Sequence, residues 1–309
     1  MMGRYPLPLS QTDLHLHSSV SPCGEISPRG LAELCCQHGV TLAALTDHNA
    51  VSGTEEFIWR CAQLGVRAVS GVELDCMFGD QTLHLLGYGF RIADTALLHA
   101  LQEAQARQKA AGLRLLDAIE ALGICFDRER VLDLAGDGAV CAELIAVDAL
   151  PRPENQQHPL LEPLLRSDTP TDCTPLRFYQ TLCAPDKPAY VRVEYMTVEH
   201  AIHLLHSANG LAVLAHPGAN QLEPALPDVL VQLPFDGLEA FSSCHTATQS
   251  ASYQAKAREM HWLVTGGSDF HGRSKPEIRV GAIDWLGQEN EVRAAFLTVL
   301  TTTPRGSTG

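Results

Sequence analysis

Histidines and carboxylates recur at the ends of the short apolar segments in this chain. The first such segment ends in His15-Leu16-His17, and the second ends in Asp47-His48. The same residue types recur at the later segments, at Glu73, His84, His216, Asp269 and His271. Where parallel strands close into a barrel, the active site lies at the carboxyl ends of the strands. The sequence therefore predicts that these side chains share one rim of a barrel.

The spacing of these residues is that of metal ligands. Alternate side chains of a strand share a face, so His15 and His17 can reach one point, as can Asp269 and His271. Imidazole and carboxylate groups suit zinc, manganese or iron, and so many ligands indicate two or three ions. A single histidine at a strand end is more often a satisfied polar residue than a ligand, so the prediction rests on the recurrence. Metals about 3.5–4 Å apart commonly serve in-line attack on phosphoryl groups.

Short apolar strands alternate with amphipathic helices around these residues. Strands are expected at 12–17, 41–46, 67–73, 82–88, 211–216, 237–241 and 263–268. Helices are expected at 27–38, 53–64, 198–207 and 248–261. This alternation predicts an α/β fold in which helices cover a parallel sheet.

The stretch 93–187 has a different character. Residues 95–122 are rich in Ala, Leu, Gln and Arg and predict one long helix or two, whereas 151–175 is rich in Pro, Asn, Gln and Asp and predicts a long loop. We therefore expect a discontinuous barrel domain at 10–92 and 188–290, an inserted helical module at 93–187, and a frayed tail at 301–309.

Composition narrows the classes of function. Of the 309 residues, 45% are hydrophobic, which is enough for a large core, and the net charge of −14 disfavours binding to long nucleic acids. No apolar run approaches the roughly 20 residues of a membrane span, and the start does not resemble a secretory signal. A soluble cytoplasmic protein without a membrane partner is expected. The ten cysteines contain no CxxC pair and predict reduced thiols.

At this level of detail the chain resembles the PHP (polymerase and histidinol phosphatase) family of phosphoesterases, and most closely its nucleotide phosphatase and 5′-end ribonuclease branch. The matching stretches are DLHLHSSVSPCGEISP (13–28), GVTLAALTDHNAVSG (39–53), GVEL (71–74), LHLLGYGF (83–90), GLAVLAHPG (210–218), GLEAFSSCHT (237–246) and TGGSDFHG (265–272). The resemblance implies a distorted (βα)7 barrel with an inserted, mainly helical lid. It also implies a centre of two or three Mn, Zn or Fe ions.

The resemblance also assigns roles to residues of this chain. The implied metal ligands are His15, His17, His48, Glu73, His84, His216, Asp269 and His271. Glu73 would bridge two metals, and Asp47 would orient ligands without binding metal. His245 lies where the family has a histidine near the scissile phosphate, so His245 or Asp269 is expected to handle the proton of the leaving group.

Two departures from the family pattern stand out. Nucleotide-acting relatives read S-D-G after the second histidine and bind a third metal through that Asp, but here the run is Ser21-Pro22-Cys23-Gly24. Four alternatives remain for the missing aspartate. Cys23 could replace it as a thiolate ligand, Glu25 could bind the metal instead, the third metal site could be weakened, or the segment could be a plain structural turn. The insertion of the family's nucleotide phosphatases often carries an Arg-x-His pair, and this pair is absent from the aligned stretch 140–145 of this chain. Glu143, in the same stretch, is a candidate to face the pocket instead.

Other basic residues are candidates for holding a phosphate. Arg192, Arg273 and Lys275 lie near the matching stretches, although a surface role is an equal alternative. His200, His203 and His206 recur at helical spacing, which is more typical of the outer face of a barrel helix than of a metal site.

We expect a metal-dependent phosphoesterase in which a metal-activated hydroxide attacks phosphorus. The expected substrate is a small phosphate monoester or a nucleotide, such as a nucleoside 3′,5′-bisphosphate or a short RNA 5′ end. Two alternatives are a metal-dependent hydrolase of another bond, such as an amide, and a non-catalytic binding module. The sequence does not predict the oligomeric state.

Overall fold

The computed structural model describes residues 9–165, 175–220, 222 and 226–302. Its strands form one seven-stranded sheet whose spatial order is the chain order. The strands are β1 (Thr12–Leu16), β2 (Leu42–Leu45), β3 (Arg67–Phe78), β4 (Gln81–Tyr88), β5 (Leu211–Leu214), β6 (Gly237–Ser242) and β7 (Leu263–Gly267). Every residue of β1, β2, β5 and β6 is buried, as expected for strands covered on both faces.

The two ends of the sheet meet just beyond β1 and β7. The Asp269 N–H donates to the His15 carbonyl at 2.9 Å, and the His17 N–H donates to the Phe270 carbonyl at 3.0 Å. Gly267 permits this approach, because a Cβ at this position would lie only 2.2 Å from the His15 Cβ. The sheet is therefore a nearly closed barrel, which confirms the predicted distorted (βα)7 class.

One strand runs against the predicted direction. β3 continues past Glu73 to Phe78 and turns through Gly79, at φ 59°, directly into the antiparallel β4. β4 is also antiparallel to β5. The prediction of a wholly parallel sheet is wrong here, because so short a turn can join only antiparallel strands. His84 consequently enters the barrel from within β4, opposite Asp75, and not from a strand end.

Helices on the outside of the barrel follow the predicted ranges closely. They are α1 (Pro28–Gln37), α2 (Thr54–Gln63), α8 (Val198–Ser207), α9 (Asp228–Val231), α10 (Ala247–Glu259) and α11 (Glu289–Thr302). Side-chain caps explain several starts: Ser27 Oγ accepts the Gly30 N–H, and Thr246 forms a reciprocal capping box with Gln249. α9 and α11 were not predicted. Thr301 and Thr302 belong to α11, and the rest of the predicted tail lies outside the described residues.

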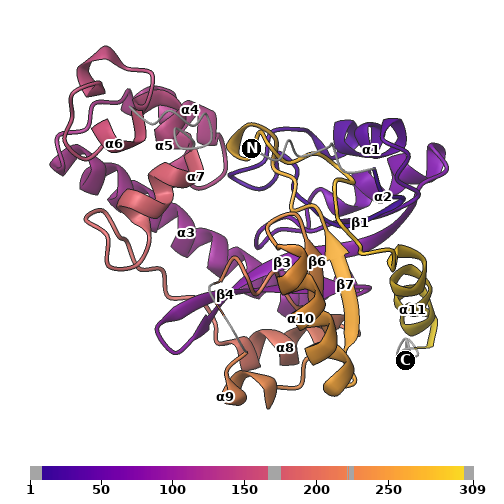
Figure 1. Ribbon diagram of the computed structural model, residues 1–309. Coiled ribbons are helices and arrows are strands. Elements are labelled where there is room, and N and C mark those ends of the chain that lie inside the picture. The colour runs from indigo at the N-terminus through magenta and orange to yellow at the C-terminus, as the bar shows by residue number, and fades with distance from the viewer. Residues whose placement is uncertain (1–8, 166–174, 221, 223–225, 303–309) are drawn as a thin grey trace.

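The stretch between β4 and α8 is helical. Its elements are α3 (Thr95–Ala121), α4 (Arg128–Ala135), α5 (Ala142–Ala149), η1 (Pro153–Asn155), α6 (Glu162–Leu165), α7 (Pro175–Phe178) and η2 (Tyr179–Cys183). Figure 1 shows α3 as a single rod that leads from the barrel to the cluster of α4–α7. Leu116, Ile145 and Phe178 belong to an apolar core that shares no residue with the cores of the barrel.

Part of the expected loop at 151–175 is ordered as η1 and α6, and 166–174 lies outside the described residues. Buried Asn155 explains the order, since its amide donates to the Cys125 and Ala149 carbonyls at 2.7 Å each. None of the helices described is both long and apolar enough to cross a membrane.

Candidate metal centre

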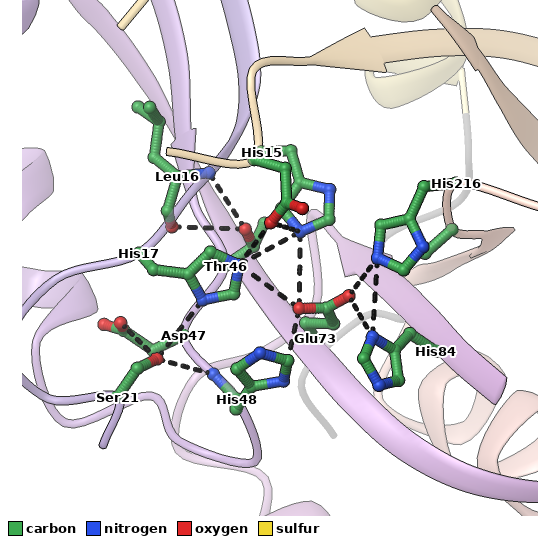
Figure 2. Close-up of polar contacts among 12 residues, drawn as sticks. His15, Leu16, His17, Ser21, Thr46, Asp47, His48, Glu73, His84 and His216 are labelled. Atoms are coloured by element: carbon green, nitrogen blue, oxygen red, sulfur yellow. Dashed lines mark hydrogen bonds and ion pairs between the residues drawn. The ribbon is translucent and has the colours of Figure 1, made fainter. Parts of the chain in front are cut away.

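The Glu73 carboxylate, fully buried in β3, is the middle of the site. Three imidazole nitrogens surround its Oε2 atom: His15 Nε2 at 3.3 Å, His17 Nε2 at 3.2 Å and His48 Nδ1 at 3.2 Å. His15 lies in β1, His17 follows it, and His48 follows the parallel neighbour β2, so adjacent strands deliver all three rings to one rim. Figure 2 shows these rings turned toward the carboxylate.

The second oxygen of Glu73 faces a separate pair of rings. His84 Nδ1 and His216 Nε2 each lie 2.9 Å from Oε1, and these two nitrogens are 3.4 Å apart (Figure 2). His216 follows β5, and His84 reaches the same point from the antiparallel β4. A carboxylate with imidazoles gathered at each oxygen is suited to bridging two cations.

The segment after β7 closes the site on the side of His17. Asp269 Oδ1 lies 3.3 Å from His17 Nε2, and the backbone of Asp269 has a φ of 57°, a costly conformation for a residue other than glycine. His271 stacks on His17 with ring centroids 4.0 Å apart, and its Nδ1 donates to the Asp269 carbonyl at 2.8 Å. Lys275 Nζ lies 2.5 Å from Asp269 Oδ2. The structure thus gathers a carboxylate, an imidazole and an ammonium at one edge of the cluster.

Glu239 in β6 is a residue of the site that the sequence analysis missed. It is fully buried, and both of its oxygens lie within 3.2 Å of His15 Nδ1. Such a contact holds the proton on Nδ1 and directs the Nε2 lone pair of His15 toward Glu73. The one signal in the sequence was a lone acid among the apolar residues of GLEAF, and an isolated acid of this kind is weak evidence.

Asp47 lies behind the histidines, and its backbone carbonyl accepts the Glu73 N–H at 3.2 Å. Its Oδ1 accepts hydrogen bonds from the Ser18 N–H at 2.7 Å and from Ser21 Oγ at 2.8 Å. Ser21 Oγ in turn lies 3.3 Å from His17 Nδ1 and accepts the His48 N–H at 2.9 Å. Asp47 therefore organises the turn that positions His17 and His48 (Figure 2).

Asp75 is a second residue that the sequence analysis did not single out. Its Oδ1 lies 3.3 Å from both His48 Nδ1 and His84 Nε2, and Oδ2 accepts hydrogen bonds from Asn49 Nδ2 at 2.8 Å and Gln108 Nε2 at 2.6 Å. Gln108 lies on α3, so this carboxylate links the long helix to the candidate ligands. The sequence did carry a signal for Asp75: it lies two residues after Glu73, so both side chains point to the same face of β3.

The charges of the cluster are strongly coupled. Burial alone would lower the pKa of His15, but the carboxylates of Glu239, Glu73 and Asp269 raise it well above its ordinary value. Burial would raise the pKa of Glu73, but the imidazoles of His48, His15 and His84 hold it well below its ordinary value. A cation bound here would compete with protons on these rings, so binding is expected to be pH-dependent.

The donor set fits divalent cations. Four groups have donor atoms that all lie within 4.8 Å of one another: His15, His17 and Asp269; His15, Glu73 and His216; His48, Glu73 and His84; and His17, Cys23, His48 and His271. Among the described residues, the buried atoms Glu73 Oε2, His48 Nδ1 and His216 Nδ1 make no hydrogen bond. Leaving such atoms unsatisfied is costly, and a cation would satisfy them.

His245, predicted to act on the substrate, lies beside the cluster at the end of β6. Its Nδ1 donates to the Ala240 carbonyl at 3.1 Å, and its Nε2 accepts the Gly218 N–H at 3.2 Å. Gly218 follows His216 by two residues, so the ring is held next to a candidate ligand while belonging to none of the four groups. Its catalytic role stays a prediction.

The structure does not bring the predicted arginines into the cluster. Arg192 pairs with Asp80 at 2.8 Å and with Glu194 at 2.7 Å. Arg273 pairs with Glu25 at 2.8 Å and is 69% exposed, whereas Lys275, two residues on, is only 21% exposed and touches Asp269. Of the basic candidates after β7, Lys275 therefore lies nearer the candidate ligands.

The remaining candidates lie further out. Burial, Cys141 and Glu143 raise the pKa of the Cys23 thiol well above its ordinary value. Glu143, on α5, therefore lies near Cys23, but it belongs to none of the candidate groups. His200 and His203 are exposed on α8, as expected for the outer face of a barrel helix.

The fold and the cluster together define an α/β barrel with a candidate metal centre at the rim. The family model of the PHP domain matches residues 13–135, which include the first histidine pair, Glu73 and His84. The predicted resemblance to the PHP family is confirmed over this part of the chain.

Named relatives support the predicted branch of this family. The chain is 28% identical to the 3′,5′-nucleoside bisphosphate phosphatase of Chromobacterium violaceum, over 88% of this chain and 91% of the relative. It is 29% identical to a phosphoribosyl 1,2-cyclic phosphate 1,2-diphosphodiesterase of Eggerthella lenta, over 84% and 94%. It is 28% identical to the 5′-3′ exoribonuclease Rnm of Salmonella typhimurium, over 89% of each.

Solved structures share the fold. A protein from Chromobacterium violaceum, named as an amidohydrolase, matches with a TM-score of 0.75 and 22% identity over 93% of this chain and 97% of that one. A protein from Bifidobacterium adolescentis matches with a TM-score of 0.72 and 20% identity, over 94% and 97%. At these identities the likeness concerns the architecture alone.

Proposed function

We propose that this protein is a metal-dependent phosphoesterase that hydrolyses a small phosphate monoester or a nucleotide. The observation that carries the proposal is the convergence of imidazoles and carboxylates on the two oxygens of buried Glu73, with the ammonium of Lys275 at the edge. Five histidines supply these imidazoles, namely His15, His17, His48, His84 and His216, and a sixth, His271, stacks on His17. So many ligands exceed the needs of one structural ion, which has four.

Two cations fit around Glu73. One would be held by His15, His17 and Asp269 with Oε2 of Glu73, and the other by His84 and His216 with Oε1. Divalent Mn, Zn or Fe at such positions supplies an acidified water and neutralises charge on a phosphoryl group. The proposal keeps three predictions made from the sequence: the metal is Mn, Zn or Fe, two or three ions bind, and the protein is cytoplasmic.

The chain's own residues would position the substrate. Lys275 would bind a non-bridging phosphate oxygen, because it is the partly exposed ammonium beside the candidate ligands. His245 would return a proton to the leaving oxygen through Nε2, which would have to give up the Gly218 N–H that it accepts here, while Nδ1–H stays held by the Ala240 carbonyl. Imidazole is suited to this role near neutral pH.

A small phosphorylated substrate fits the rest of the chain. The net charge is −14, and Arg192 and Arg273 are each paired with acids, so the surface offers little to hold a long polyanion. The named activities of the relatives, on a nucleoside bisphosphate, a cyclic phosphate and RNA ends, support a nucleotide or a short RNA end.

The test is release of phosphate by the metal-loaded protein from p-nitrophenyl phosphate, a nucleoside 3′,5′-bisphosphate and a 5′-phosphorylated oligoribonucleotide. We expect turnover with Mn²⁺ and a loss of at least about a thousandfold in Glu73→Gln. The matched control is Glu291→Gln, an exposed glutamate on α11, which should keep full activity. Turnover of amide or lactone substrates with no phosphate release from any of the three would contradict the proposal.

A further inference from the structure

One group of candidate ligands contains a sulfur atom. Donor atoms of His17, Cys23, His48 and His271 all lie within 4.8 Å of one another. The rings of His17 and His271 stack at 4.0 Å, and those of His17 and His48 stack at 4.6 Å. The chain thus brings three imidazoles and one thiol within reach of a single cation.

The loop that carries Cys23 is held by its backbone. Ser274 Oγ donates to the Cys23 carbonyl at 2.6 Å, and the Gly24 N–H donates to the Ser21 carbonyl at 3.1 Å. A Cβ at Gly24 would lie 1.9 Å from the Ser18 carbonyl oxygen, so the loop can turn this tightly only with glycine there. The position of the sulfur therefore follows from fixed backbone contacts on both sides of Cys23.

The competing carboxylate is engaged elsewhere. Glu25 Oε2 accepts the Arg273 N–H at 2.8 Å, and its Oε1 pairs with the Arg273 guanidinium at 2.8 Å. Glu25 belongs to none of the groups of candidate ligands among the described residues. Of the two substitutes that the sequence allowed for the missing aspartate, the contacts favour Cys23.

We propose that Cys23 binds a further cation as a thiolate, together with imidazoles of His48 and His271, and thereby makes this position selective for zinc. The inference rests on the proposed function, because it adds a ligand to the same centre. Thiolate with imidazole favours Zn²⁺ and Co²⁺ over Mn²⁺ and Mg²⁺, which prefer oxygen. The thiol releases its proton to solvent when the cation binds.

The test uses Co²⁺ as a spectroscopic probe on the full-length protein stripped of metal. A thiolate ligand gives a sulfur-to-cobalt charge-transfer band in the near ultraviolet, and we expect this band in the wild type. Cys23→Ser and Cys23→Asp should both lose it, and Cys125→Ser, at an exposed cysteine of the helical region, should keep it. Competition titration should show that Cys23→Ser weakens the zinc bound at this position by at least about a hundredfold, since even indirect partners of a ligand are worth about 10- to 100-fold.

The outcomes separate this inference from the proposed function. No charge-transfer band in the wild type, or a band that persists in Cys23→Ser, would overturn the thiolate ligand even if the enzyme releases phosphate. A band that depends on Cys23 in a protein without phosphate release would support the ligand and reject the phosphoesterase. Cys23→Asp guards against misfolding, because a carboxylate can keep the cation while it removes the band.

Discussion

At the scale of single residues, three of the candidate ligands are each oriented by a partner that lies behind the ring. Glu239 faces Nδ1 of His15, Ser21 faces Nδ1 of His17, and the Asp269 carbonyl accepts from Nδ1 of His271. In each case the partner occupies one ring nitrogen and leaves the other for the centre. Such partners fix the tautomer and orientation of a metal-binding imidazole, so they are expected to matter nearly as much as the ligands.

Glu239 gives the sharpest test of this idea. Glu239→Gln keeps the size of the side chain but removes the charge behind His15, so metal affinity should fall by about 10- to 100-fold. Titration against a competing chelator measures this directly. Glu291→Gln, at an exposed site on α11, is the matched control and should bind metal like the wild type. An unchanged affinity in Glu239→Gln would show that the contact does not orient a ligand.

Lys275 tests the substrate side of the site. Lys275→Met should lower kcat/KM for phosphate substrates by about tenfold to a hundredfold, mainly through KM, because a hydrogen bond to a charged group contributes about 1.5–3 kcal/mol. Metal content should not change, and Lys275→Arg should restore part of the activity. Lys256→Met, which removes a surface lysine paired with Glu259, is the control. A loss of bound metal with KM unchanged would instead assign Lys275 to positioning Asp269.

At the scale of elements, the closure between β1 and the segment after β7 builds the site. The buried carboxylate of Asp13 accepts the Ser268 N–H and the Gly281 N–H, both at 2.8 Å, and so ties the first strand to the segment after the last one. Burial raises the pKa of Asp13 to about 6, although these hydrogen bonds oppose the shift. The same closure sets His15 and His17 beside Asp269.

The helical region contains an ion pair whose carboxylate is buried. The Asp148 carboxylate on α5 accepts the Asp127 N–H at 2.8 Å and lies 2.6 Å from the Arg152 guanidinium. Burial opposes the shift, but these contacts hold the pKa of Asp148 below its ordinary value. A carboxyl whose pKa is lowered by folding stabilises the protein above its unfolded pKa, and this contribution is lost as the pH falls through the folded value.

Asp148→Asn should therefore destabilise the protein by about 1–3 kcal/mol at neutral pH, because it weakens bonds to two donors at a buried acceptor. The difference from the wild type should begin to shrink as the pH falls below about 4, the ordinary carboxyl pKa, and vanish only below the lower folded pKa, where the wild-type carboxyl is protonated too. Urea unfolding at several pH values measures both effects. Asp133→Asn, on the exposed face of α4, serves as the control. A difference that stays constant from pH 7 to below pH 4 would refute the ionic contribution.

At the scale of the whole molecule, the barrel and the converging histidines could be predicted because local patterns carry them. The expected strand at 82–88 differs from β4 by a single residue, and the expected helix at 198–207 has the bounds of α8. The direction of β4 was missed because β3 runs on to Phe78, which leaves room only for a turn. A strand that continues past its ligand gives no local signal of where it ends.

The partners of charged groups were the least predictable part. Arg192 pairs with Asp80, which lies 112 positions earlier in the chain, and no local pattern reports such a contact. Glu239 was missed for the same reason. Its importance comes from its contact with the ring of His15, which lies 224 positions earlier in the chain. Residues whose role depends on one distant neighbour become visible only once the fold is known.

The measurement that tests the central claim most directly is phosphate release from a nucleoside 3′,5′-bisphosphate as metal is added back, in counted equivalents, to chelator-stripped protein. We predict no release from the stripped protein, a rise with bound metal, and saturation at two or three equivalents per chain. Release that is independent of bound metal, or no release from the fully loaded protein with any phosphate substrate, would contradict the account.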